Sequence, residues 1–232
     1  MAVVKMRYLL LCAVLAAGIF LAVTYHRRSI PTFVADSFSG TTVILDAGHG
    51  GVDGGATSAD GIIESDVNLA VTRRLALLMI FCGQRVALTR IDAGDLASPD
   101  AQSIRDKKVS DLQNRVAAIN SISNAVLISI HQNTLAGNTK VRGAQAFYNT
   151  VQDANGRANL IQQSLNDGIN PQNAKNAKPI DKSIYLMNRV NCPAILVECG
   201  FLSNPQEAYQ LCTPDYQKQL AVAIAAGYLL YQ

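Results

Sequence analysis

Short runs of β-branched apolar residues alternate with stretches of helical periodicity from Thr42 onward. This alternation is typical of α/β proteins, in which helices cover a mostly parallel sheet. The runs expected to be strands are 43–48, 85–90, 125–131, 143–149, 183–188 and 194–200. The sequence therefore predicts a single domain over residues 42–232. Its core would be an open, twisted, mostly parallel sheet of about six strands, flanked by helices on both faces.

Helices are expected between these strands. The first would be capped by Ser65 and closed by Gly83, because apolar residues recur between them at helical spacing. Further helices are expected at about 112–120, 155–166 and 214–231. The polar stretch 92–108 has no apolar periodicity, so we expect a long surface loop there.

An uncharged apolar run, residues 8–25, precedes the predicted domain and has basic residues on both sides. It is longer than the core of most cleaved signal peptides and approaches the ~20 residues that span a bilayer. We interpret residues 1–28 as a signal-anchor and residues 29–41 as a linker; a cleaved signal peptide is the alternative. The domain is then expected outside the cytoplasm, anchored to the membrane, or secreted if the segment is cleaved.

Charge and cysteine usage argue against several classes of protein. The four basic residues before position 29 account for the net charge of +3, leaving 16 basic and 17 acidic residues in the rest of the chain. No basic stripe is interleaved with aromatic residues, so nucleic acid is not an expected partner. The five cysteines form no CxxC pair, which predicts neither a thiolate zinc site nor a disulfide framework. Cys192 and Cys199 are expected to be buried free thiols.

Two histidines lie where predicted strands end. His49 follows the first strand within the glycine-rich DAGHGGVDGGA, and His131 closes LISIHQN. The third histidine, His26, adjoins the N-terminal apolar run. Open α/β sheets bind ligands at the carboxyl ends of their strands. Because imidazole nitrogens are good zinc ligands, the sequence predicts a metal site that uses His49 and His131.

Two glutamates are expected at the same edge of the sheet. Glu64 directly precedes the predicted helix, and Glu198 lies in the apolar LVECG, where a charge is costly unless it faces a site. A catalytic zinc commonly takes two histidines and one glutamate, which would leave the other acid as a general base. The spacing is not HExxH, and each of these residues taken singly could be structural. The glycine-rich turn also matches neither common phosphate-binding motif.

Seven segments, in order, resemble the amidase-3 class of N-acetylmuramoyl-L-alanine amidases, and the resemblance covers residues 42–232. The segments are DAGHGGVDGGA, IIESDVNLA, LTRIDA, LQNRVAAIN, LISIHQN, GAQAFYN and PAILVECGFLSNPQEAYQL. The resemblance implies that His49, Glu64 and His131 bind one Zn²⁺ and that Glu198 is the catalytic acid. It also implies hydrolysis, in peptidoglycan, of the amide between N-acetylmuramic acid and the L-alanine of the stem peptide.

Two positions depart from the family pattern. Ala47 stands where the family commonly has proline, and Ser65 stands where it commonly has lysine; neither change removes an implied ligand. Without wall-binding repeats, and with the N-terminal segment, the chain looks like the small membrane-anchored amidases of endospore formers. Those enzymes act on spore cortex and prepare muramic δ-lactam. Remodelling of the vegetative cell wall is the alternative role.

Two other functions are alternatives. One is a non-catalytic peptidoglycan-binding regulator with the amidase fold, and the other is a zinc peptidase that cleaves the stem peptide. The presence of all four implied site residues favours the enzyme over the regulator. The sequence is also compatible with a protein activator as a partner. Asp46 is expected to order the turn after the first strand rather than to contact substrate. Three further polar residues are expected near the site, with hydrogen bonds that could equally be structural: Arg115, Asn133 and Asn204.

Overall fold

The computed structural model of the chain describes residues 40–231. The predicted signal-anchor and all but the last two residues of the predicted linker lie outside this range. Among residues 40–231, none of the helices combines the length and apolarity needed to cross a bilayer.

The six strands of the described part form one sheet in the order β2-β1-β3-β6-β4-β5. Neighbouring strands are parallel except for β4, which runs antiparallel to β6. This confirms the predicted open and mostly parallel sheet. The strands are β1 (Thr42–Ala47), β2 (Arg85–Leu88), β3 (Ala125–Asn133), β4 (Gln145–Tyr148), β5 (Lys178–Pro179) and β6 (Ala194–Phe201).

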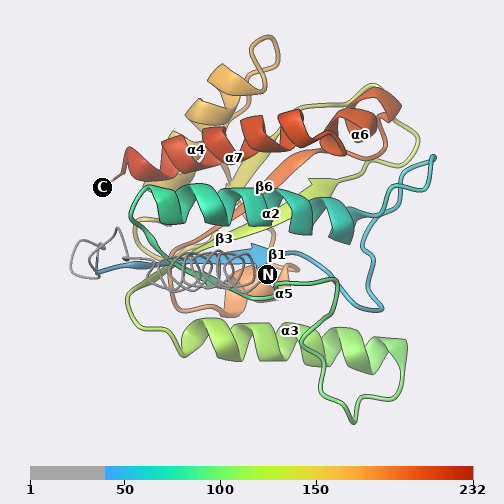
Figure 1. Ribbon diagram of the computed structural model, residues 1–232, viewed down its shortest axis with the longest axis vertical. Helices are drawn as coiled ribbons and strands as arrows, with labels where there is room; N and C mark the ends of the chain where they lie inside the picture. Colours follow the sequence, from blue (N-terminus) through green and yellow to red (C-terminus); the bar gives the residue numbers. More distant parts are fainter. Residues whose placement is uncertain (1–39, 232) are drawn as a thin grey trace, which may run out of the picture. The chain divides into compact units, whose positions relative to one another are not determined.

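Helices cover both faces of the sheet, as predicted (Figure 1). On one face lie α2 (Glu64–Phe81), α4 (Ala154–Gly168) and α7 (Pro214–Leu229), and on the other lie α3 (Ile104–Asn120) and α5 (Tyr185–Arg189). A short helix, α6 (Pro205–Leu211), connects β6 to α7. Each face has its own apolar core because alternate strand residues point to opposite sides. In β1, for example, Val43 belongs to one core and Ile44 to the other.

The strand predicted at 183–188 is wrong. Most of this segment lies in the one-turn helix α5. The sheet still has six strands because it includes the two-residue β5, which the sequence did not indicate. Leu186 and Met187, both good helix formers, are buried next to each other, and this does not fit the alternation of a strand. The side chain of Asn188 donates to the Ile184 carbonyl four residues earlier, which stabilises the turn.

Helix boundaries also differ from the prediction. α3 begins at Ile104, so the stretch 92–108 is only partly loop, and a capping box formed by Ser103 and Asp106 explains the early start. α2 begins at Glu64 with Ile63 as its N-cap, so Ser65 does not cap it. The unpredicted α6 carries its own start signals, because Asn204 accepts from two backbone N–H groups and a proline follows.

The cysteines of the described part are all unpaired, which agrees with the absence of a predicted disulfide framework. Cys199 is buried as expected, whereas Cys192 is only half-buried. Cys82 and Cys212 are exposed.

Candidate metal and active site

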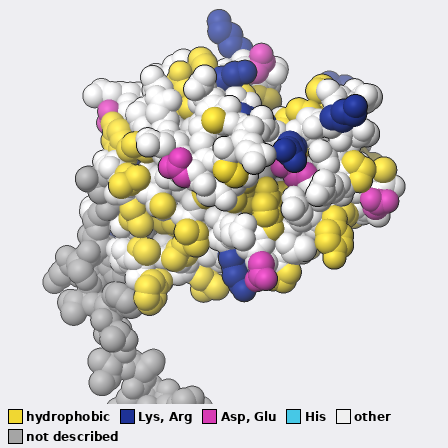
Figure 2. Space-filling view, turned by 90° about the horizontal axis from the view of Figure 1, so that it is seen from above, with side chains coloured by type: hydrophobic (Ala, Val, Ile, Leu, Met, Phe, Trp, Pro, Cys, Tyr) yellow, Lys and Arg dark blue, Asp and Glu magenta, His cyan; other side chains and the backbone are white. Residues whose placement is uncertain are grey.

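His131 and Glu198 are brought side by side by the register of the sheet. They occupy paired positions on the neighbouring parallel strands β3 and β6. Paired residues project to the same side of a sheet, here the side covered by α3 and α5. In the view from the α7 side of the molecule no histidine is visible, which agrees with this placement (Figure 2).

His49 reaches the same site from the turn that follows β1. Its backbone has a φ of 61°, in the left-handed region that few non-glycine residues adopt. Two buried arginines hold this turn: the Arg115 guanidinium donates to the His49 carbonyl oxygen at 2.7 Å, and Arg90 donates to the carbonyls of Ala47 and Gly48. These hydrogen bonds offset the strain of a conformation that points the imidazole at the end of β3.

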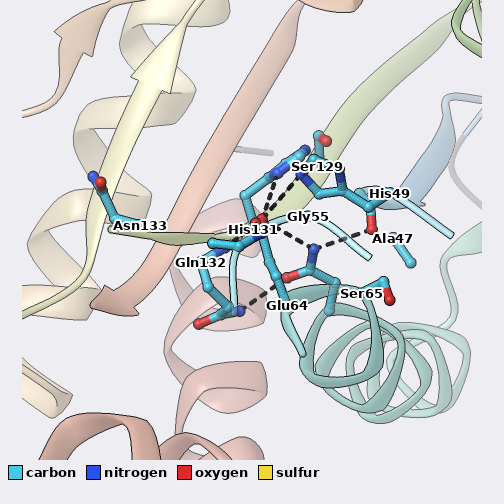
Figure 3. A network of polar contacts seen from close by, with 12 residues as sticks. Ala47, His49, Gly55, Glu64, Ser65, Ser129, His131, Gln132 and Asn133 are labelled. Carbon is cyan, nitrogen blue, oxygen red and sulfur yellow. Dashed lines mark hydrogen bonds and ion pairs between the residues drawn. The ribbon is translucent and has the colours of Figure 1, made fainter. Parts of the chain in front are cut away.

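Glu64 lies at the first position of α2 and faces both imidazoles (Figure 3). Its Oε1 lies 3.0 Å from Nδ1 of His131 and 3.3 Å from Nε2 of His49. The carboxylate is fixed by backbone donors as well, since Oε1 accepts from the N–H of Gln132 and Oε2 from that of Ala56. One carboxylate and two imidazoles therefore converge, with one ligand atom from each lying within 4.8 Å of the others.

Two glycines make this approach possible. A Cβ at Gly48 would lie 2.3 Å from the His131 ring, and a Cβ at Gly55 would lie 2.5 Å from Oε2 of Glu64. Gly55 also has a φ of 72°. Any side chain at either position would separate the three groups.

The three converging groups attract positive charge. Burial alone would lower the pKa of His49, but hydrogen bonds and charge from Glu64 and Asp53 outweigh it and raise the pKa to about 9. Burial likewise opposes ionisation of Glu64, yet His131 and His49 hold the pKa of its carboxyl well below the usual range. Two imidazoles and one carboxylate are a donor set suited to zinc.

Glu198 is in a different environment. Its Oε2 is buried and has no hydrogen-bond partner among the described residues. Burial raises the pKa of this carboxyl to about 7, with the neighbouring Glu64 adding to the effect and the histidines opposing it. A carboxyl with a pKa near neutrality and an unused oxygen is suited to proton transfer.

All four predicted site residues line one cleft of about 460 Å³. Apolar and aromatic side chains also line the cleft, among them Leu112 of α3 and Tyr185 and Leu186 of α5. The cleft lies at the carboxyl ends of β1, β3 and β6, where an open α/β sheet places its ligands.

Comparison with known proteins agrees with this geometry. Residues 43–229 match the profile of the amidase-3 family, described as N-acetylmuramoyl-L-alanine amidase. The chain belongs to this amidase family. The germination-specific N-acetylmuramoyl-L-alanine amidase of Bacillus subtilis is 40% identical over 194 residues, covering 83% of this chain and 80% of that protein.

Solved amidases share the fold of this amidase. The CwlD amidase of Clostridioides difficile, whose structure was determined in complex with the GerS lipoprotein, is 38% identical with a TM-score of 0.78. The alignment covers 82% of this chain and 99% of that one. An N-acetylmuramoyl-L-alanine amidase from Clostridium difficile 630 is 28% identical with a TM-score of 0.70, covering 82% of this chain and 96% of that chain.

The amidase site is supported by residues that sequence reasoning did not single out. The Asn68 side chain donates to the Gly48 carbonyl at 3.1 Å and to Oε1 of Glu64 at 3.3 Å. The Gln132 side chain donates in turn to Asn68 at 3.0 Å. Asn68 was detectable in principle, because it lies one helical turn after Glu64 and a buried helical Asn needs polar partners.

Two of the further polar residues, Asp46 and Arg115, line the cleft of the amidase and also support its structure. Asp46 and Arg115 form a buried ion pair at 2.6 Å, with Ser129 and Thr89 donating to the same carboxylate, so Asp46 orders the end of β1 as expected. Asn204 caps α6 and is structural. Asn133 lines the cleft.

Proposed function

We propose that this amidase hydrolyses, with zinc, the amide bond between N-acetylmuramic acid and L-alanine in peptidoglycan. Family membership supports the reaction class. The observation that carries the finer proposal is the convergence of His49, Glu64 and His131 beside Glu198 in one cleft. We propose the first three as ligands of a single Zn²⁺ and Glu198 as the catalytic residue.

The proposed ligand atoms follow from the contacts. Nε2 of His49, Nδ1 of His131 and Oε1 of Glu64 face one another. Zinc bound there would activate a water and polarise the scissile carbonyl. Glu198 lies beside His131 and would take a proton at its free Oε2 and later return it to the leaving amine.

The alternatives make different products. A stem-peptide peptidase would leave L-alanine attached to muramic acid, and a non-catalytic regulator would release nothing. Glu198 favours catalysis, because a buried carboxylate oxygen without a hydrogen-bond partner costs stability and supports no neighbouring group among the described residues.

Digestion of purified peptidoglycan by the full chain is expected to release an intact stem peptide that begins with L-alanine. A strong chelator should abolish release, and added zinc should restore it. Circular dichroism should change little on chelation, since the two apolar cores do not depend on one ion. Mass spectrometry of the products checks the bond cleaved. Peptides that lack L-alanine, or undiminished release in chelator, would contradict the proposal.

A role in spore cortex, where muramic δ-lactam is formed, is the corresponding proposal for the biological substrate. It is supported by the 40% identity to a germination-specific amidase. Expression of this chain in a spore former that lacks its own cortex amidase tests the proposal, because muropeptide analysis would then detect restored δ-lactam. Cortex that remained without δ-lactam would favour vegetative-wall remodelling.

A lipoprotein partner, as in the solved CwlD complex, is also proposed for this chain.

Residues 1–28 are proposed to anchor the domain at the outer face of the membrane, with 29–41 as linker and 42–232 as the catalytic domain. The support is the uncharged run 8–25 with its basic flanks. The full chain should sediment with membranes, whereas a chain that starts at Ser29 should not. A mature N-terminus close to residue 25 would show a cleaved signal peptide and a secreted enzyme instead.

A further inference from the structure

The Asp53 carboxylate lies between the imidazole of His49 and the ammonium group of Lys108. Its Oδ2 is 2.9 Å from Nδ1 of His49, and its Oδ1 is 2.8 Å from Nζ of Lys108. The backbone N–H of Gly55 also donates to Oδ1, at 3.3 Å. Lys108 and Asp53 both line the cleft that contains the proposed metal ligands.

The contact with Asp53 determines which nitrogen of His49 can bind a cation. A carboxylate accepts hydrogen bonds only, so Nδ1 of His49 must carry the proton that Asp53 accepts. When the ring gives up its second proton to bind a cation, the lone pair is on Nε2, which faces Glu64. A hydrogen-bonded carboxylate behind a histidine ligand fixes both the tautomer and the ring orientation.

The contact with Lys108 holds Asp53 in place. The Asp53 backbone exchanges two hydrogen bonds with Gly50, whereas its side chain is 25% exposed and contacts, besides His49, only the Gly55 N–H and Lys108 among the described residues. Lys108, by contrast, is part of a regular helix, α3. Its ammonium group therefore ties the exposed side of the Asp53 carboxylate to a regular helix.

One face of α3 thus holds His49 at two points. Lys108, Asp111 and Arg115 lie at helical spacing, and all three face the turn after β1 or the loop beside it. Arg115 holds the backbone carbonyl of His49, and Lys108 holds its ring through Asp53. Arg115 is almost fully buried, whereas the Lys108 side chain is 47% exposed. Lys108 can therefore be replaced with little effect on the core.

We propose that Lys108 is a positioning residue for metal binding, which acts through Asp53 to align the ring of His49. The proposal rests on the metal site proposed above and adds a residue that is not itself a ligand. It assigns a function to a residue near the start of α3, at the end of the stretch 92–108 that the sequence indicated as loop. Direct contact of Lys108 with a carboxylate of the stem peptide is the competing role.

Zinc affinity of the full chain, measured by competition with a chromogenic chelator, tests the proposal without relying on activity. Lys108→Met is expected to weaken zinc binding by roughly 10-fold, at the lower end of the 10–100-fold typical of lost partners of metal ligands. Lys108→Arg should recover most of the affinity, because it restores a cation at the same place. Lys107→Met is the matched control, since the described residues show no ion pair for Lys107, and it should bind zinc like the parent.

A double-mutant cycle gives a second readout. Asp53→Asn should also weaken zinc binding, and adding Lys108→Met to it should cause little further loss, because both changes break one chain of contacts. The melting temperatures of the metal-free variants should match that of the parent. Unchanged zinc affinity in Lys108→Met, or a raised KM with normal zinc affinity, would overturn the proposal in favour of the substrate-binding role. Additive losses in the double variant would overturn it too. If the parent itself bound no zinc, the metal site would fail first, and this inference with it.

Discussion

Replacing Glu198 with glutamine is expected to leave zinc binding intact and to lower the rate of amide hydrolysis by at least about 10²–10⁴-fold. Glutamine has nearly the same volume and can still hydrogen-bond a water, but it cannot accept a proton. The three proposed ligands lie on other segments, so their arrangement should not change. Turnover of purified peptidoglycan and zinc content, both measured on the same preparation, check the two halves of this expectation.

Glu207→Gln is a suitable control, because Glu207 is the remaining glutamate outside the site. Its buried carboxylate accepts from the backbone N–H groups of Gly143 and Phe201, which is a structural role. This variant should lose stability while keeping its turnover number. If Glu198→Gln emptied the metal site, Glu198 would be a ligand. If the variant kept a normal rate, Glu198 would be structural, and the base would have to be another group.

The pH dependence of stability gives an independent check on Glu198. Its pKa of about 7 in the folded metal-free protein is above the ordinary value of 4.5. The folded state therefore holds this proton more tightly than the unfolded state, and the contribution to stability falls as pH rises from about 4.5 to about 7. Above pH 7, Glu198→Gln should be at least as stable as the parent in denaturant unfolding. A clear loss of stability there would show that the carboxylate has a structural partner.

The main features of the fold could be predicted because hydrophobic periodicity reports on burial. β3 and β6 are long and buried on both faces, so their apolar runs are unmistakable. β5 has two residues, both exposed, and no such pattern can reveal it. The segment of α5 resembles a strand in sequence because a single helical turn is too short to show a period of 3.6 residues.

The histidines of the candidate site could be predicted from the sequence, whereas the contact between Asp53 and Lys108 could not. His49 and His131 stand out because each ends an apolar run. Asp53 and Lys108 are 55 residues apart, and their contact arises only once α3 packs beside the turn after β1. Nothing in the sequence around Lys108 distinguishes it from Lys107. Contacts of this kind depend on tertiary packing, and local pattern does not encode them.

His131→Ala is expected to abolish both zinc binding and hydrolysis while leaving the fold intact. Removing a ligand leaves one imidazole and one carboxylate, which should weaken zinc binding by more than the ~10–100-fold typical of a lost partner of a ligand. The His131 side chain projects into the cleft from the end of β3, so its truncation removes no apolar core contact. Metal content, circular dichroism and turnover of the purified variant measure the three effects.

Glu64→Ala should lose zinc and turnover as well, but with an added loss of stability that His131→Ala does not share. The Glu64 carboxylate accepts from the backbone N–H groups of Gln132 and Ala56, and the alanine variant leaves these donors without a partner. An unsatisfied buried donor costs about 1–3 kcal/mol, so unfolding of metal-free Glu64→Ala should occur at lower denaturant than that of metal-free His131→Ala. Asn133 lies at the end of β3, the strand of His131, and lines the same cleft, so Asn133→Ala should keep its zinc. If Glu64→Ala bound zinc normally and differed from the parent only in stability, the carboxylate would organise the turn without binding metal. The third ligand would then have to come from another residue of the cleft.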